Sequence, residues 1–87
     1  MNPRIKKVIP TNDYKLILTF KNDEQKIYDC NHLLNFGVFK ELKNLEYFKQ
    51  AFIEYGTVAW PNEQDICPDT LYLGSQHLTK QSSQYIT

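Results

Sequence analysis

Apolar residues occupy every second position from 14 to 20, and this is the most regular pattern in the chain. The apolar residues at every second position are Tyr14, Leu16, Leu18 and Phe20. Successive side chains of a strand point to opposite faces, so this period predicts a strand with these four residues facing the core. A β-branched run, Ile5–Ile9, precedes it, and a turn at Asn22 leads into a third run, Gln25–Asp29. The three runs predict an antiparallel meander.

A helical pattern follows the meander. Asn31 is expected to cap a short turn, and Gly37 is expected to break the chain or to adopt a left-handed cap. Apolar residues then recur mostly three positions apart, at Phe39, Leu42, Leu45 and Phe48. This spacing predicts an amphipathic helical segment, broken near Asn44, whose apolar stripe covers one face of the sheet.

The second half of the chain predicts a hairpin and a short helix. Two apolar runs flank Gly56, and Pro61 ends the second because proline cannot donate a hydrogen bond to a strand ladder. Pro68 suits the first position of a helix, Asp69 complements the helix dipole, and Gly74 ends the helix. We therefore predict an α+β fold. It has a small antiparallel sheet (the meander plus the hairpin), one central helical segment and a short C-terminal helix.

Length and charge limit the classes of function. Eighty-seven residues make one small domain, predicted to span residues 1–75 and to be followed by a flexible polar tail at 76–87. Lys plus Arg and Asp plus Glu cancel at ten each, which argues against a dedicated nucleic-acid binder because such proteins neutralise phosphates. The charge is uneven. Residues 1–43 hold eight basic and five acidic residues, a net of +3, and residues 44–87 hold two and five, a net of −3.

No pattern typical of an active site or of a metal site is present. Cys30, His32 and Cys67 are residue types that bind zinc, but a Cys-x-His spacing without a second ligand pair is not a zinc motif. A Cys–His catalytic pair would need an orienting group and an oxyanion hole, and the sequence contains no nucleophile elbow. We expect no catalytic, cofactor-binding or metal-binding residues, and a protein that is not an enzyme.

The segment from Val58 to Tyr72 contains the only Trp and three acidic residues. Trp60 is expected either in the core or as an interface anchor, because Trp is usually well buried but also dominates binding hot spots. Asp65 and Asp69 suit a turn and a helix start, although such carboxylates could also hold a cation.

The basic N-terminal strand provides an alternative binding surface. Arg4, Lys6 and Lys7, with Tyr14 and Lys15 nearby, form a basic and aromatic cluster of the kind that stacks and neutralises single-stranded nucleic acid. Lysines on an edge strand also deter aggregation, which is the simpler explanation. A nucleic-acid-binding regulator is therefore the second hypothesis.

The N-terminus has no apolar stretch typical of a signal peptide, and no run is long enough to cross a bilayer. We expect a cytoplasmic protein that does not associate with membranes. In that reducing compartment Cys30 and Cys67 are expected to be free thiols.

Several motifs resemble those of one bacterial family. The strand from Tyr14 to Phe20, the pair Tyr28-Asp29 and the helical residues 39–48 are similar to its weaker motifs. Its more specific motif, W-P-x-x-x-D-x-x-P-D-x-L-Y, is matched at Trp60, Pro61, Asp65, Pro68, Asp69, Leu71 and Tyr72. The family is catalogued as domain of unknown function 2442, and the resemblance covers about Pro3 to Gly74.

The resemblance implies a protein-binding role. Relatives are often encoded beside another small protein, in an arrangement similar to toxin–antitoxin pairs. Some relatives also fuse a helix-turn-helix region after this domain, which is not expected here because the chain ends too early. The main hypothesis is a protein-interaction module, the antitoxin-like member of a two-protein system, with the neighbouring protein as partner and a homodimer as a further option. The predicted partner-binding residues are Trp60, Asp65, Asp69 and Tyr72.

Overall fold

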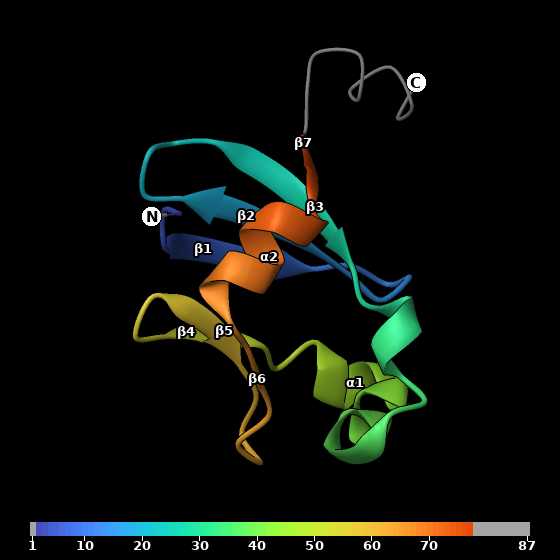
Figure 1. The fold of residues 1–87 in the computed structure, drawn as a ribbon. Coiled ribbons are helices and arrows are strands. Elements are labelled where there is room, and N and C mark those ends of the chain that lie inside the picture. The colour runs from blue at the N-terminus through green and yellow to red at the C-terminus, as the bar shows by residue number, and fades with distance from the viewer. Residues whose placement is uncertain (1, 78–87) are drawn as a thin grey trace.

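The first three strands form the meander that the alternation predicts. The structure is a computed structural model and describes residues 2–77. The strands are β1 (Ile5–Pro10), β2 (Lys15–Phe20) and β3 (Gln25–Asp29), and they pair antiparallel in sequence order. A two-residue strand, β7 (Gln76–His77), pairs with β3 and completes a four-stranded sheet of order β1-β2-β3-β7 (Figure 1).

This sheet has one buried and one open face. Leu16, Leu18 and Phe20 are fully buried, which confirms the side of β2 predicted to face the core. Between them, Ile17 and Thr19 point to the opposite face and stay partly exposed. We call this partly exposed side of the sheet the open face.

The helical segment breaks at Asn44, as predicted, but its first half is a 3-10 helix. Element η2 spans Gly37–Lys43, and α1 spans Leu45–Phe48. Asn44 has an extended ψ of 109°. Its side-chain oxygen accepts hydrogen bonds from the backbone N–H groups of Glu46 (3.1 Å) and Tyr47 (3.4 Å). Asn44 therefore ends one helix and caps the next.

The predicted role of Asn31 as a helix cap is wrong. The short 3-10 turn η1 spans Asn31–Leu33, and its N-cap is Cys30, whose side chain makes no capping bond. Asn31 instead donates through Nδ2 to the carboxylate of Asp29 (2.8 Å) and to the carbonyl of Asp13 (3.1 Å). These bonds tie the turn after β3 to the turn before β2.

The predicted second hairpin is present and belongs to a second sheet. Its strands are β4 (Phe52–Glu54) and β5 (Thr57–Ala59), and a two-residue strand, β6 (Asp65–Ile66), extends the order to β4-β5-β6. Gly56 occupies the hairpin turn with a φ of +79°. Its carbonyl accepts a 2.9 Å hydrogen bond from the N–H of Ile5. This bond joins the start of β1 to the second sheet.

The short C-terminal helix is also confirmed. α2 spans Pro68–Gly74, with Pro68 at its start and Asp69 in its first turn. Figure 1 shows α2 lying in front of the sheets, with β4, β5 and β6 below the four-stranded sheet and α1 at the lower right. Ile66 and Leu71 are both buried, so the approach to the helix and the helix itself are anchored in the core.

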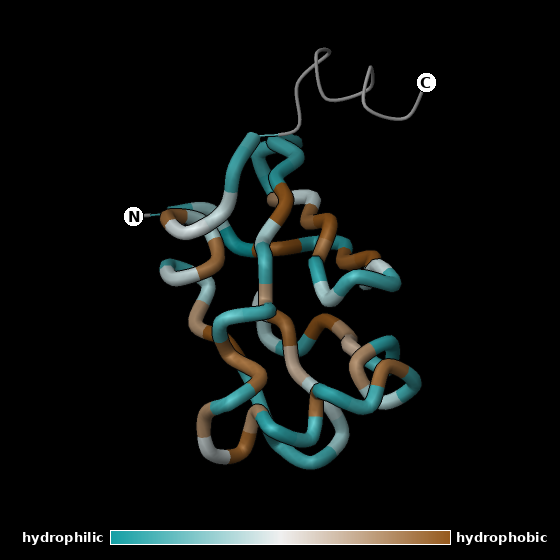
Figure 2. The backbone as a smooth tube through the Cα atoms, turned by 90° about the vertical axis from the view of Figure 1, so that its right-hand side faces the viewer, coloured by the Kyte–Doolittle hydropathy of each residue, from teal (hydrophilic) through white to brown (hydrophobic). Residues whose placement is uncertain are grey.

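The core lies between the two sheets, α2 and the central helical segment. Its largest fully buried side chains are Trp60, Phe20 and Phe48. In Figure 2 hydrophobic stretches of the chain are short and are interrupted by hydrophilic ones, as expected for elements with one buried side. Within residues 2–77, no helix has the length and apolar character needed to span a membrane.

Residues 76 and 77, which were predicted to begin the tail, form strand β7. Gln76 pairs with Ile27 and His77 with Lys26, so the first two residues of the predicted tail are part of the sheet. The rest of that predicted tail, residues 78–87, lies outside the described residues.

Candidate interaction surface

The outer side of α2 combines an exposed apolar side chain with a carboxylate. The helix turns Leu71 into the core and leaves Asp69 and Leu73 exposed. Residues four apart lie on the same side of a helix, so Leu73 stands one turn beyond Asp69. Leu73 is 73% exposed. Sequence reasoning missed Leu73. Its position is nevertheless a signal, because Leu73 is four residues from Asp69, on the same side of the helix, and two residues from the core residue Leu71, on the opposite side.

Trp60 does not lie on this surface. Its side chain is 1% exposed, and its indole Nε1–H donates a 2.8 Å hydrogen bond to the carbonyl of Phe48. The two rings pack with their centres 6.0 Å apart. Of the two roles expected for Trp60, the structure therefore shows the core role.

Tyr72 connects α2 to the hairpin between β2 and β3. Its hydroxyl donates a 2.6 Å hydrogen bond to the carboxylate of Glu24, and its ring meets Phe20 edge-on at 5.0 Å. The Nζ of Lys26 donates to the carbonyl of Tyr72 (2.6 Å) and lies 3.9 Å from the centre of its ring. Lys26 is only 6% exposed, so a carbonyl and a cation–π contact replace much of the water around its charge.

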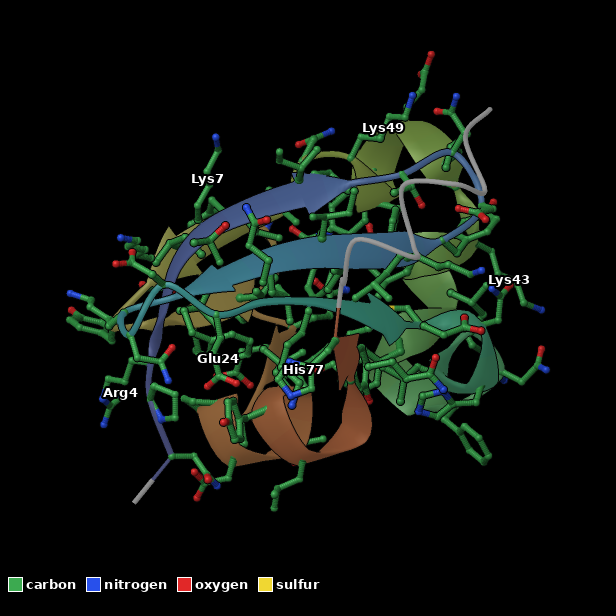
Figure 3. The ribbon with its side chains drawn as sticks, turned by 90° about the horizontal axis from the view of Figure 1, so that it is seen from above. Arg4, Lys7, Glu24, Lys43, Lys49 and His77 are labelled. Carbon is green, nitrogen blue, oxygen red and sulfur yellow. The ribbon has the colours of Figure 1, made fainter. Side chains whose placement is uncertain are left out.

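Glu24 is the carboxylate that Tyr72 and His77 contact. The hydrogen bond from Tyr72, together with one from Asn22, lowers the pKa of Glu24, and the same bond raises the pKa of Tyr72. The Nε2 of His77 lies 3.6 Å from the second carboxylate oxygen of Glu24, and Figure 3 shows the two side chains close together beside β3. The contacts of Tyr72, Glu24 and His77 thus link α2, the β2–β3 hairpin and β7.

Asp65 and Asp69 are exposed and have separate neighbours. Asp65 lies on β6, where its backbone pairs with Ala59. Asp69 accepts a 3.2 Å hydrogen bond from Asn2. Within the described part of the chain, no three His, Cys, Asp or Glu side chains are grouped as a metal site would require. The two aspartates place negative charge at both ends of the connection from β6 to α2.

The two thiols occupy opposite environments. Cys30 is buried, and burial, followed by the nearby charge of Asp29, raises its pKa to about 12, whereas Cys67 is exposed. The thiolate is the reactive form of cysteine. We therefore expect iodoacetamide to label Cys67 in the folded protein and Cys30 only after denaturation, as measured by peptide mass spectrometry. Cys67→Ser is the control and should stay unlabelled while folded. Equal labelling rates of both thiols in the folded protein would contradict the burial of Cys30.

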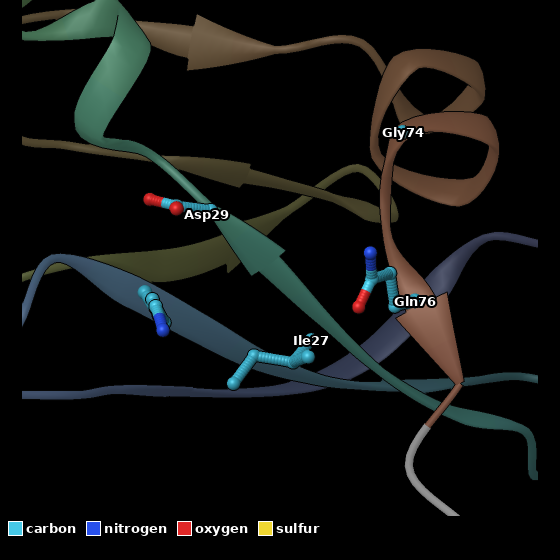
Figure 4. A pocket seen from close by; sticks show the side chains of 5 residues that line it. Ile27, Asp29, Gly74 and Gln76 are labelled. Carbon is cyan, nitrogen blue, oxygen red and sulfur yellow. The ribbon is translucent and has the colours of Figure 1, made fainter.

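A shallow pocket lies at the edge of the four-stranded sheet, away from the outer side of α2. Figure 4 shows it between β2, β3 and the connection from α2 to β7, and its lining residues are Lys15, Ile27, Asp29, Gly74 and Gln76. Lys15 and Asp29 are cross-strand partners, so the pocket contains one cation and one carboxylate. The hydrogen bond from the backbone N–H of Asn31 is the main cause of the lowered pKa of Asp29.

Two cations of the basic N-terminal strand have partners within the protein. Arg4 donates a 2.9 Å hydrogen bond to the carbonyl of Tyr55, and Lys6 pairs with Asp23 at 2.5 Å. Lys7 is exposed and, in Figure 3, projects from β1 on the side away from α2. Exposed pairs such as Lys6–Asp23 are weak, yet they lower the charge available to phosphates. The geometry gives the nucleic-acid hypothesis no added support, and it stays a prediction.

These features define a small α+β domain with two antiparallel sheets and a short helix that exposes Asp69 and Leu73. The chain belongs to the DUF2442 family, described as a protein of unknown function, whose profile matches residues 5–77. The resemblance seen in the sequence is thereby confirmed, and the match includes the specific motif from Trp60 to Tyr72. No curated protein and no solved structure matches the chain.

Proposed function

We propose that this protein is a protein-interaction module that binds its partner through the outer side of α2 and the adjoining end of β6. This α2 surface consists of Asp65, Asp69, Leu73 and the accessible part of Tyr72. The observation that supports it best is the 73% exposure of Leu73 one turn from Asp69. A partner with an apolar pocket bordered by Lys or Arg side chains would complement it.

Trp60 supports this surface from inside the protein. Its indole hydrogen bond to Phe48 fixes the end of β5, and the backbone of Trp60 also bonds to Gln64 (2.9 Å) on the way to β6. Gln64 is buried and donates to Glu41 (2.9 Å). Replacement of Trp60 would therefore disturb the fold and the surface together, so it cannot test binding by itself.

We infer a more specific role as the antitoxin-like member of a two-protein system. The resemblance to a family whose members are often encoded beside another small protein supports this role. The net charge of −3 over residues 44–87 is consistent with a basic partner. In this role the module would occlude the functional surface of the neighbouring protein.

The test is coexpression with the neighbouring protein and purification through a tag on that neighbour. We expect a complex of fixed stoichiometry. In a titration, Leu73→Ser should raise the Kd about tenfold or more, because it removes an apolar anchor from the interface. Asp69→Ala should raise the Kd by a smaller factor that shrinks with added salt.

Phe36→Ser is the matched control, since Phe36 is also apolar, is 65% exposed and lies before η2. It should leave the Kd unchanged. Failure of two soluble proteins to copurify would refute the two-protein role. A stable complex that is weakened by Phe36→Ser but not by Leu73→Ser would place the interface elsewhere.

A further inference from the structure

The open face of the four-stranded sheet carries a row of isoleucines. Ile17 of β2 lies opposite Ile9 of β1 on one side and Ile27 of β3 on the other. The alternation of the strands turns all three away from the core. Ile9 is 45% exposed, and Ile17 and Ile27 are partly exposed. A row of three β-branched side chains on one face is an apolar stripe rather than a scattered exposed residue.

Charged residues stand at opposite corners of this face. Lys7 on β1 pairs with Thr19 at one end of β2, and Asp29 on β3 pairs with Lys15 at the other end. Lys7 and Asp29 are both exposed. Because they lie on strands to either side of β2 and near its opposite ends, they are diagonally opposite each other, with Ile17 midway between them.

We propose that the open face binds the open face of a second copy of this chain, in a symmetric dimer with Ile17 near the two-fold axis. This proposal concerns a different surface from the α2 surface and goes beyond the function proposed above. The partner is identified by charge complementarity. A two-fold axis that runs diagonally across the face places Lys7 of each copy over Asp29 of the other, because an isologous contact repeats itself in reverse.

The same axis makes the strands of the two copies cross at a steep angle. Orthogonal crossing, at about 90°, is one of the two ways in which sheets pack face to face. The isoleucine rows then cross at Ile17, so apolar side chains occupy the centre and the two ion pairs lie at the rim. At the Asp29 end, Lys15 and Asp13 pair with each other at 3.6 Å.

The conditions for association are also favourable. The chain has a formal net charge of zero, so two copies do not repel each other at long range. The hydrogen bonds from Asn31 lower the pKa of Asp29, so its carboxylate stays charged in mildly acidic solution. A face of three short strands and the two-residue β7 is at the small end of protein interfaces, so we expect a weak dimer that forms at high concentration.

Sedimentation equilibrium of the full chain tests the proposal with a charge swap. The mass should rise toward two chains as concentration increases from micromolar to millimolar. Lys7→Glu alone and Asp29→Lys alone should each weaken dimerisation at least about tenfold, because each places like charges together. An equimolar mixture of the two variants should dimerise again. The new carboxylate at position 7 of one chain then meets the new ammonium at position 29 of the other.

Two further point variants and a crosslinking experiment extend the test. Ile17→Asp should abolish dimerisation, and Leu73→Ser, on the α2 surface, should leave it unchanged. If Asp29→Lys unfolds through loss of its bonds to Asn31, crosslinking replaces the swap. A Cys67→Ser, Ile17→Cys chain should form covalent dimers with a short bismaleimide, whereas Cys67→Ser, Tyr55→Cys should not.

Three results would overturn the proposal. The first is a single-chain mass at every concentration, together with no crosslink at position 17. The second is a dimer that Ile17→Asp leaves intact. The third is a monomer in which Ile17→Asp weakens binding of the neighbouring protein, since the open face would then belong to that partner. The first two results do not involve the α2 surface, so this proposal and the proposed function can fail separately.

Discussion

Trp60→Ala is expected to lower the free energy of unfolding by about 3–5 kcal/mol, the range for removing a large aromatic side chain from a core. Trp60 is 1% exposed and packs against Phe48, so its loss leaves a cavity between the second sheet and α1. The carbonyl of Phe48 also loses its indole donor. A domain of this size has a stability of only about 5–15 kcal/mol. Urea unfolding followed by circular dichroism measures the change.

One variant separates the contribution of the ring from that of the indole hydrogen bond, and a second is a control at an exposed position. Trp60→Phe keeps a ring in the core but removes the indole donor, so it should cost less than Trp60→Ala. Tyr55→Ala removes an aromatic side chain that is 88% exposed and should change the free energy of unfolding by no more than about 0.5 kcal/mol. An unfolding midpoint for Trp60→Ala equal to that of the unmodified protein would contradict the core position of the indole.

Gly56→Ala is expected to lower the free energy of unfolding by about 2–4 kcal/mol, from backbone strain and overpacking together. Gly56 has a φ of +79°, and a Cβ added there would lie 2.9 Å from the Cβ of Arg4 and 2.6 Å from its Cδ. Relief would require moving the start of β1, where Ile5 bonds to the carbonyl of Gly56. The same urea experiment measures the loss.

Gly37→Ala is the matched control. Gly37 also has a positive φ, +46°, but a Cβ added there meets nothing within 4 Å. It should show only the cost of the backbone conformation, about 1 kcal/mol. The difference between the two glycine variants isolates the contact with Arg4. Equal losses would show that the close approach of Arg4 to Gly56 does not limit the fold.

The elements with a clear period were predictable from the sequence. Alternation identified β2 and its buried side, and the proline and aspartate at the start of α2 identified that helix. Two-residue strands such as β6 and β7 are too short to show a period, so they could not be predicted. The three-residue spacing of Phe39 and Leu42 fits the 3.0 residues per turn of a 3-10 helix, but the same spacing also occurs in α-helices, so the 3-10 geometry of η2 was not predicted.

The candidate site was less predictable than the fold. Asp65 and Asp69 were expected at a surface and are exposed, but the sequence left Trp60 open between core and interface, because the partner of its indole N–H, the carbonyl of Phe48, is brought there by tertiary structure. Lys26 shows the same limit. A lysine inside a strand is expected at the surface. Tyr72, which is distant in the sequence, provides the carbonyl and the ring that Lys26 contacts.

The placement of α2 also affects how the chain must be made. Synthesis delivers the N-terminus first, so the β1–β3 meander leaves the ribosome before the residues that cover it. Until Ile66 and Leu71 have emerged, the side of β2 that includes Leu18 and Phe20 lacks part of its cover. The nascent chain therefore exposes an apolar sheet late into translation, and this interval is when chaperones would bind it and when misassociation is most probable.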